Sequence, residues 1–179
     1  MTLLDDYGAV LDAVKTEYVE TFRGVLAEMR AARHYGYDNT VFFIGNGGSS
    51  AIASHMAIDF QKAANIKAMC FTDAASITAL GNDLGFERIF VEPLRMHAEA
   101  EDILVAISSS GRSPSIVHAA REARSMGVRV VTLTGFDPVN PLREVGHYNF
   151  HVASHRYGVV ETTHLAICHE ILDQLVGHL

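Results

Sequence analysis

Between Leu3 and Arg33, apolar residues recur every three or four positions with charged residues between them. This period matches the turn of an α-helix, so we expect one or two amphipathic helices in this stretch. They carry more apolar surface than a small single core requires, and we expect residues 1–35 to mediate self-association. The apolar positions are Val10, Leu11, Val14, Val19, Phe22, Val25, Leu26 and Met29.

From residue 40 onward, short runs of β-branched and aromatic residues alternate with segments of helical period. Strands that alternate with helices through short loops predict a parallel sheet covered by helices on both faces, the doubly wound α/β class of flavodoxin-like and Rossmann-like folds. We expect strands at 40–44, 67–72, 103–107, 128–135 and 149–153, and helices at 50–62, 75–80, 114–126 and 161–179.

Length and composition narrow the class of protein. The 179 residues suit a single domain, 1–179, and a net charge of −7 gives no broad attraction for nucleic acid, so we expect no direct nucleic-acid binding. No stretch approaches the roughly 20 uncharged apolar residues of a membrane helix. Cys70 and Cys168 are the only cysteines, and the N-terminus lacks the positive charge of a signal peptide. We therefore expect a reduced, cytoplasmic protein outside the membrane.

Two segments rich in glycine and serine follow predicted strands: 45–50 (GNGGSS) and 108–113 (SSSGRS). In a parallel α/β sheet, ligands bind at the carboxyl ends of the strands, where a following helix offers free N–H groups to an anion. Either loop alone equally fits a flexible turn, and Ser113 fits the N-cap position before Pro114. Two such loops at one edge of the sheet together favour a phosphate site.

The ten histidines direct attention to metal or acid–base chemistry. His55 and Asp59 lie four apart on a predicted helix and project from one face, although an isolated pair of this kind is more often an ordinary surface pair. Near the C-terminus, Glu161, His164 and His169 lie among residues that we expect to face the core. A buried histidine often only satisfies a core hydrogen bond. Because Glu161 and His169 fall about 80° apart around the helix, spacing alone does not establish a site.

Three motifs, GNGGSSAIASH (45–55), TDAASITALGNDLGF (72–86) and ISSSGRSPS (107–115), resemble in order and spacing those of the sugar isomerase (SIS) family. The resemblance runs from about residue 40 to the C-terminus and is greatest to the phosphoheptose isomerases, which interconvert sedoheptulose 7-phosphate and an aldose heptose 7-phosphate. It implies a SIS fold and a phosphorylated sugar ligand. It further implies phosphate contacts at Ser108, Ser109, Ser110 and Ser113, and sugar-site residues at Asn46, Ser49 and Asp73.

The same resemblance implies a homotetramer with one zinc ion per subunit, bound by His55, Asp59, Glu161 and His169. It implies an aldose–ketose isomerisation through an enediol, in which Asp59 takes the C–H proton and His169 exchanges the second proton. The family usually has glutamate at the position of Asp59, glutamine at that of Glu161, and an arginine near Ala63. Imidazole nitrogen and carboxylate oxygen are acceptable zinc ligands. The departure at Ala63 bears on the identity of the substrate.

Two alternative functions remain open. The same fold serves in phosphosugar-binding modules without catalysis, and in a bacterial replication-initiation partner similar to these isomerases; Asp59 and Ala63 favour this alternative. The joint presence of His55, Glu161 and His169 favours an enzyme, because a binding module has no evident use for that set. An isomerase acting on a different sugar phosphate is compatible with every motif.

Overall fold

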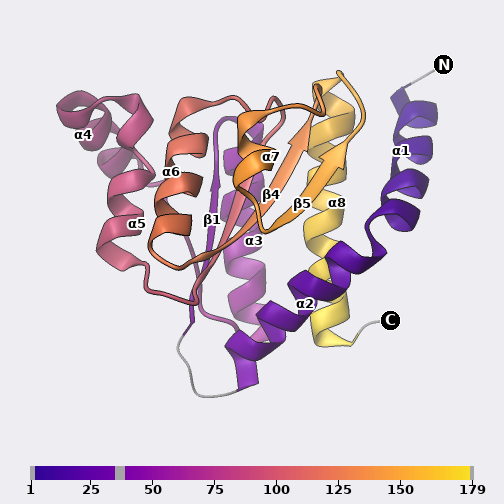
Figure 1. The fold of residues 1–179 in the computed structure, drawn as a ribbon, viewed down its shortest axis with the longest axis horizontal. Coiled ribbons are helices and arrows are strands. Elements are labelled where there is room, and N and C mark those ends of the chain that lie inside the picture. Colours follow the sequence, from indigo (N-terminus) through magenta and orange to yellow (C-terminus); the bar gives the residue numbers. More distant parts are fainter. Residues whose placement is uncertain (1–2, 35–38, 178–179) are drawn as a thin grey trace.

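The computed structural model (Figure 1) describes residues 3–34 and 39–177. It contains one parallel sheet in the order β2-β1-β3-β4-β5. The chain moves outward from β1 in one direction to β2 and in the other to β3. The topological switch point therefore lies between β1 and β3, whose carboxyl ends carry the glycine and serine loops. The strands are β1 (Val41–Gly45), β2 (Ala68–Cys70), β3 (Ile103–Ser108), β4 (Arg129–Gly135) and β5 (Tyr148–Val152).

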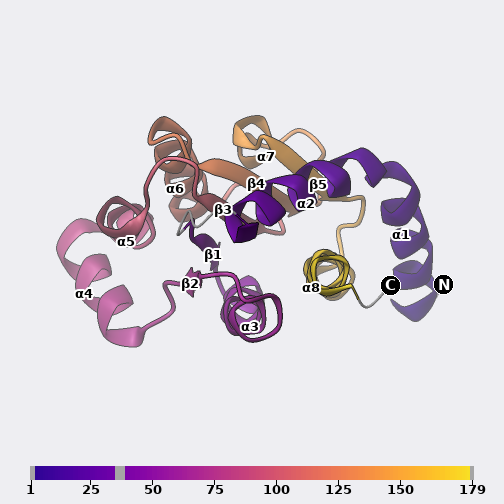
Figure 2. The ribbon, with the colours of Figure 1, turned by 90° about the horizontal axis from the view of Figure 1, so that it is seen from below.

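Helices cover both faces of the sheet, as the alternation of strands and helices predicted (Figure 2). Successive strand residues point to opposite faces; Phe43 thus joins the core beneath α2, α3 and α8, and its neighbour Phe42 joins the core beneath α5 and α6. The α/β class and the doubly wound arrangement are confirmed. The longer helices are α1 (Leu3–Glu17), α2 (Val19–His34), α3 (Gly48–Ala64), α4 (Ala74–Leu84), α6 (Pro114–Ser125) and α8 (Tyr157–Val176).

The N-terminal stretch forms two helices, α1 and α2, which both pack against α8. The last helix begins at Tyr157 rather than Glu161 and is described as far as Val176; the predicted end at residue 179 lies outside the described residues, as does residue 35 of the N-terminal stretch. Among the helices of the described residues, none combines the length and the apolarity that a membrane crossing requires.

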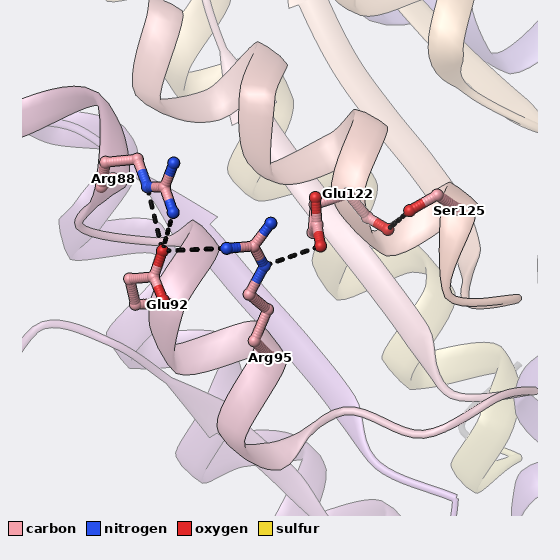
Figure 3. Close-up of polar contacts among 5 residues, drawn as sticks. All are labelled: Arg88, Glu92, Arg95, Glu122 and Ser125. Atoms are coloured by element: carbon pink, nitrogen blue, oxygen red, sulfur yellow. Dashed lines mark hydrogen bonds and ion pairs between the residues drawn. The ribbon is translucent and has the colours of Figure 1, made fainter.

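Three short helices were not predicted: η1 (Phe86–Arg88), α5 (Val91–His97) and α7 (Pro141–Val145). One or two turns are too short to display a helical period. A chain of charges joins η1 and α5 to α6 (Figure 3). Glu92 accepts hydrogen bonds from Arg88 and Arg95, and Nε of Arg95 donates to Glu122 at 2.7 Å. Chiefly through its hydrogen bond with Arg88, the pKa of Glu92 is held below its ordinary value.

Candidate active site

The loop between β1 and α3 leaves the first turn of α3 open to a ligand. Gly47 is the N-cap residue, with φ of 55°, and no side chain of its own caps the helix. Glycine is favoured there because residues with a Cβ are strained in this region. Asn46 reaches across to the first turn of α6, since its Nδ2 donates to Oγ of Ser115 at 2.9 Å. Ser49 is buried in the first turn of α3.

The loop between β3 and α6 gathers hydroxyl groups at the adjacent strand end. The Ser108 hydroxyl donates to Oγ of Ser113 at 3.3 Å, and Oγ of Ser110 accepts from the backbone N–H of Arg112 at 3.2 Å. Ser113 is the N-cap residue of α6 but makes no side-chain capping bond. Ser109 is buried, and its Oγ has no hydrogen-bond partner in the described structure. A buried hydroxyl without a partner is costly, so this loop is suited to a ligand that accepts hydrogen bonds.

The serine loop is held in place by the segment that follows β4. The backbone N–H of Gly135 donates to the carbonyl of Ser109 at 2.9 Å, and the Arg112 guanidinium donates to Asp137 at 3.0 Å and to the carbonyl of Val139 at 2.7 Å. The backbone N–H of Val139 and the Arg112 guanidinium lower the pKa of Asp137. These contacts hold the loop in one conformation, and a preformed loop loses less entropy when a ligand binds.

Both loops line one cavity of about 250 Å³ at the carboxyl ends of β1 and β3. Its walls include Asn46 and Ser49 from the first loop, and Ser108, Ser109, Ser110 and Ser113 from the second. The first turns of α8 complete it with Tyr157 and Glu161. The structure thus brings together six of the seven predicted phosphate and sugar residues.

Asp73, the seventh, lies outside the residues that line this cavity. Its carboxylate caps α4, accepting the backbone N–H of Ser76 at 2.9 Å, and this bond lowers its pKa. Its predicted contact with sugar stays a prediction.

Glu161 lies in the cavity beside the first residue of α3. A Cβ built on Gly48 would collide with its carboxylate, so the absence of a side chain at Gly48 makes room for Glu161. The carboxylate is not part of the group of potential metal ligands that the structure gathers further along the helices. Its predicted role as a metal ligand therefore stays a prediction.

Three potential metal ligands converge on α3 and α8. Each of His55, Asp59 and His169 offers a ligand atom, and these atoms all lie within 4.8 Å of one another. Nε2 of His55 is 3.0 Å from Oδ2 of Asp59, and the His55 and His169 rings meet edge to face with centroids 5.2 Å apart. Two imidazole nitrogens and one carboxylate oxygen are a donor set that zinc uses in catalytic sites. Three of the four predicted ligands thus fit a divalent metal.

His164, on the same helix, is a core residue. Its Nε2 lies 3.0 Å from the carbonyl oxygen of Thr134, and the ring is fully buried, which lowers its pKa to about 4. The ring is therefore neutral at neutral pH and anchors α8 to the end of β4. This agrees with the expectation that some histidines of the C-terminal helix only satisfy core hydrogen bonds.

Two residues of the site were not found from the sequence. Tyr157 lines the cavity, and Ser115 receives the hydrogen bond from Asn46. Tyr157 precedes Glu161 by four positions, so once the helix is known to begin at residue 157 the two fall on one face. Ser115 lies inside the ISSSGRSPS motif, where its proximity to the other loop could not be read from spacing.

Comparisons with known proteins agree with this geometry. The SIS domain family model matches residues 5–135. A phosphoheptose isomerase of Solidesulfovibrio magneticus is 34% identical over 170 residues, which cover 91% of this chain and 80% of that protein. The structure of a phosphoheptose isomerase from Neisseria gonorrhoeae aligns with a TM-score of 0.83 at 27% identity, over 96% of this chain and 94% of that one. One from Francisella tularensis has the same score and identity and covers 100% of both chains.

The predicted SIS fold is thus confirmed by the family model and by two solved structures that align over nearly the whole chain. The serine loop and all of α6 lie within the matched residues, whereas α8 lies beyond them and is covered by the structure from Francisella tularensis. The chain belongs to the SIS domain family and, within that family, is an isomerase of the phosphoheptose isomerase group.

Proposed function

We propose that this protein interconverts sedoheptulose 7-phosphate and D-glycero-D-manno-heptose 7-phosphate through an enediol. The observation that carries the proposal is the convergence of His55, Asp59 and His169 on α3 and α8, the two helices whose first turns line the cavity at the serine loop. At a rise of about 1.5 Å per residue, α3 spans about 9 Å from Ser49 to His55. Phosphate bound at the serines and a chain of about six carbon–carbon bonds, each about 1.5 Å long, cover a distance of this order.

The serine hydroxyls and the N-terminus of α6 hold the phosphate. Binding of this non-reacting group positions the reacting carbons near His55, Asp59 and His169. Asp59 takes the proton from the carbon next to the carbonyl, and His169 exchanges the proton at the neighbouring oxygen. His55 stands 3.0 Å from Asp59 and orients its carboxylate. His55, Asp59 and His169 would hold a zinc ion, which would supply Lewis acidity to stabilise negative charge on the substrate oxygens.

The proposal is tested by incubating the purified protein with ketose phosphates in deuterated water and following C1 and C2 by NMR. We expect deuterium to enter sedoheptulose 7-phosphate, because a proton removed by a carboxylate exchanges with solvent before it returns. The Asp59→Asn variant keeps the shape of the side chain but lacks the base, and it should show no exchange.

A wild-type protein that binds these phosphates without any exchange would contradict the proposal and favour the non-catalytic phosphosugar-binding module. Exchange with another ketose phosphate, but none with sedoheptulose 7-phosphate, would identify an isomerase for a different sugar phosphate. The panel therefore separates all three functions.

We propose a homotetramer that assembles through α1 and α2. An apolar groove runs between these helices and α8, lined by Leu11, Val14, Val19, Phe22 and Ile167. Charged residues of both signs, Lys15 and Glu170 among them, lie at the same groove and suit contact with another copy of the chain. Light scattering should return about four times the subunit mass of 19.5 kDa. A mass of 19.5 kDa at micromolar concentration would contradict this assembly.

A further inference from the structure

Three aromatic rings adjoin one another beside the serine cavity, and the proposed isomerisation uses none of them. The rings of Phe136 and Tyr157 meet edge to face with centroids 4.9 Å apart, and the ring of His155 stacks on that of Phe136 at 5.7 Å. Tyr157 lines the cavity yet remains 62% exposed, so its ring lies at the rim. A flat ring exposed at the rim of a phosphate cavity is suited to stacking on a planar group of a ligand.

The backbone at Phe136 is strained, and hydrogen bonds on either side of it tie the rings to the serine loop. Phe136 has a φ of 59°, a value that is rare for a bulky side chain. Its N–H donates to the carbonyl of Ser154 at 3.0 Å, and the N–H of the preceding Gly135 donates to the carbonyl of Ser109 at 2.9 Å. Such strain persists only where the surroundings hold it, and it gathers at ligand sites. The position of the rings is therefore coupled to the loop that receives the phosphate.

The sugar of the proposed reaction does not account for these rings. Aldose–ketose isomerisation takes place on an open carbon chain, which has no flat face, and that chain must run from the serines toward His169. Tyr157 precedes His169 by twelve residues, about 18 Å along α8. A planar group that stacks on Tyr157 therefore belongs to a different ligand. The described residues that line the cavity include one carboxylate, Glu161, and no lysine or arginine, which favours a ligand with one phosphate group over a diphosphate.

We propose that the cavity also binds a nucleoside monophosphate, whose phosphate occupies the serine loop and whose base stacks on Tyr157. The proposal rests on the phosphate site of the proposed function and adds a ligand that competes with the sugar phosphate there. A cavity of about 250 Å³ is small for a ligand of nucleotide size. The base therefore extends to the rim, where the ring of Tyr157 is exposed. Every base has a flat π face, so stacking on this ring adds affinity for any of them.

The test compares AMP with ribose 5-phosphate, which share the ribose and its 5′-phosphate and differ by the adenine base. Isothermal titration calorimetry of the wild-type protein should give a Kd for AMP about tenfold lower than that for ribose 5-phosphate. Tyr157→Leu keeps an apolar side chain but removes the flat ring, and the ratio of the two constants should fall to about one. Tyr157→Phe should keep the ratio of the wild type. Phe86→Leu is the matched control and should also keep it, because Phe86 is similarly exposed, at 59%, and lies outside the cavity.

Failure of the wild-type protein to bind AMP, or equal affinity for both ligands, would overturn the proposal, as would a preference for AMP that persists in Tyr157→Leu. Weaker binding of both ligands in Tyr157→Leu, at an unchanged ratio, would assign the ring to the sugar phosphate and not to a base. Exchange of deuterium into sedoheptulose 7-phosphate is measured on the same preparation. Exchange without a preference for AMP contradicts only the nucleotide site, whereas a preference for AMP without exchange contradicts only the proposed isomerisation.

Discussion

Replacing His169 with alanine is expected to lower the isomerisation rate by a factor of about 10² to 10⁴ and to reduce the protein's content of the proposed zinc ion. His169 comes from α8, whereas His55 and Asp59 come from α3, so it alone links the two halves of the cluster. Its removal takes away both a ligand atom and the proposed proton-exchanging group. Single-turnover kinetics and elemental analysis of the same preparation measure the two losses separately.

His118→Ala is the matched control, because His118 is exposed on α6 and lies outside the cluster. His55→Ala should lose zinc as His169→Ala does, while His169 stays available for proton exchange. Zinc and rate both at wild-type levels in His169→Ala would refute the proposed chemistry at this cluster. Loss of zinc with an unchanged rate would refute only the catalytic use of the metal.

The strands and most helices were predictable because their signals are local. Runs such as 103–108 are buried on both faces and need no knowledge of partners to be identified as strands. The ends of the helices were less predictable. The start of α8, a full turn before Glu161, was missed because its N-cap residue, Arg156, makes no side-chain capping bond and is not a residue type typical of helix starts. The short helices α5 and α7 are too short to show a helical repeat of apolar residues, and both pack into the core on one face of the sheet.

The cluster of His55, Asp59 and His169 was predictable only in part, because two of its residues are neighbours on one helix and the third comes from another helix. The spacing of four placed His55 and Asp59 on one face of α3, and the structure confirms their contact at 3.0 Å. The distance from either residue to His169 depends on how α3 packs against α8, and only the family resemblance anticipated it. Glu161 and His169 are separated by about 12 Å along one helix, so a common ligand position for both was never a consequence of spacing.

The sequence indicated which residue types gather in the loop after β3, but not which contacts fix the conformation of that loop. The loop is fixed by the segment at the end of β4, which is separated from it in the sequence by α6. Gly135 donates a hydrogen bond to the carbonyl of Ser109, and Asp137 accepts one from Arg112. Likewise, the lack of a partner for Ser109 Oγ is visible only when its buried surroundings are known. These contacts hold the loop in one conformation, as the proposed phosphate site requires.

The double variant Ser109→Ala and Ser110→Ala is therefore expected to lose about 100-fold or more in kcat/KM, mainly through a higher KM. A hydrogen bond to a charged group contributes about 1.5–3 kcal/mol, and each 1.4 kcal/mol is about tenfold in affinity. In the free protein, Ser109→Ala removes a buried hydroxyl that has no partner, so the folded state should not be weakened. Steady-state kinetics and thermal unfolding of the double variant measure both expectations.

Comparison of KM with the unfolding temperature distinguishes a phosphate-binding role of these serines from a structural role. A structural role for these serines would lower the unfolding temperature together with affinity, whereas a binding role lowers affinity alone. Ser125→Ala, which removes an exposed hydroxyl at the end of α6, should change neither. An unchanged KM in the double variant would place the phosphate elsewhere than the loop after β3. The distance argument that links the cavity to His55, Asp59 and His169 would then no longer hold.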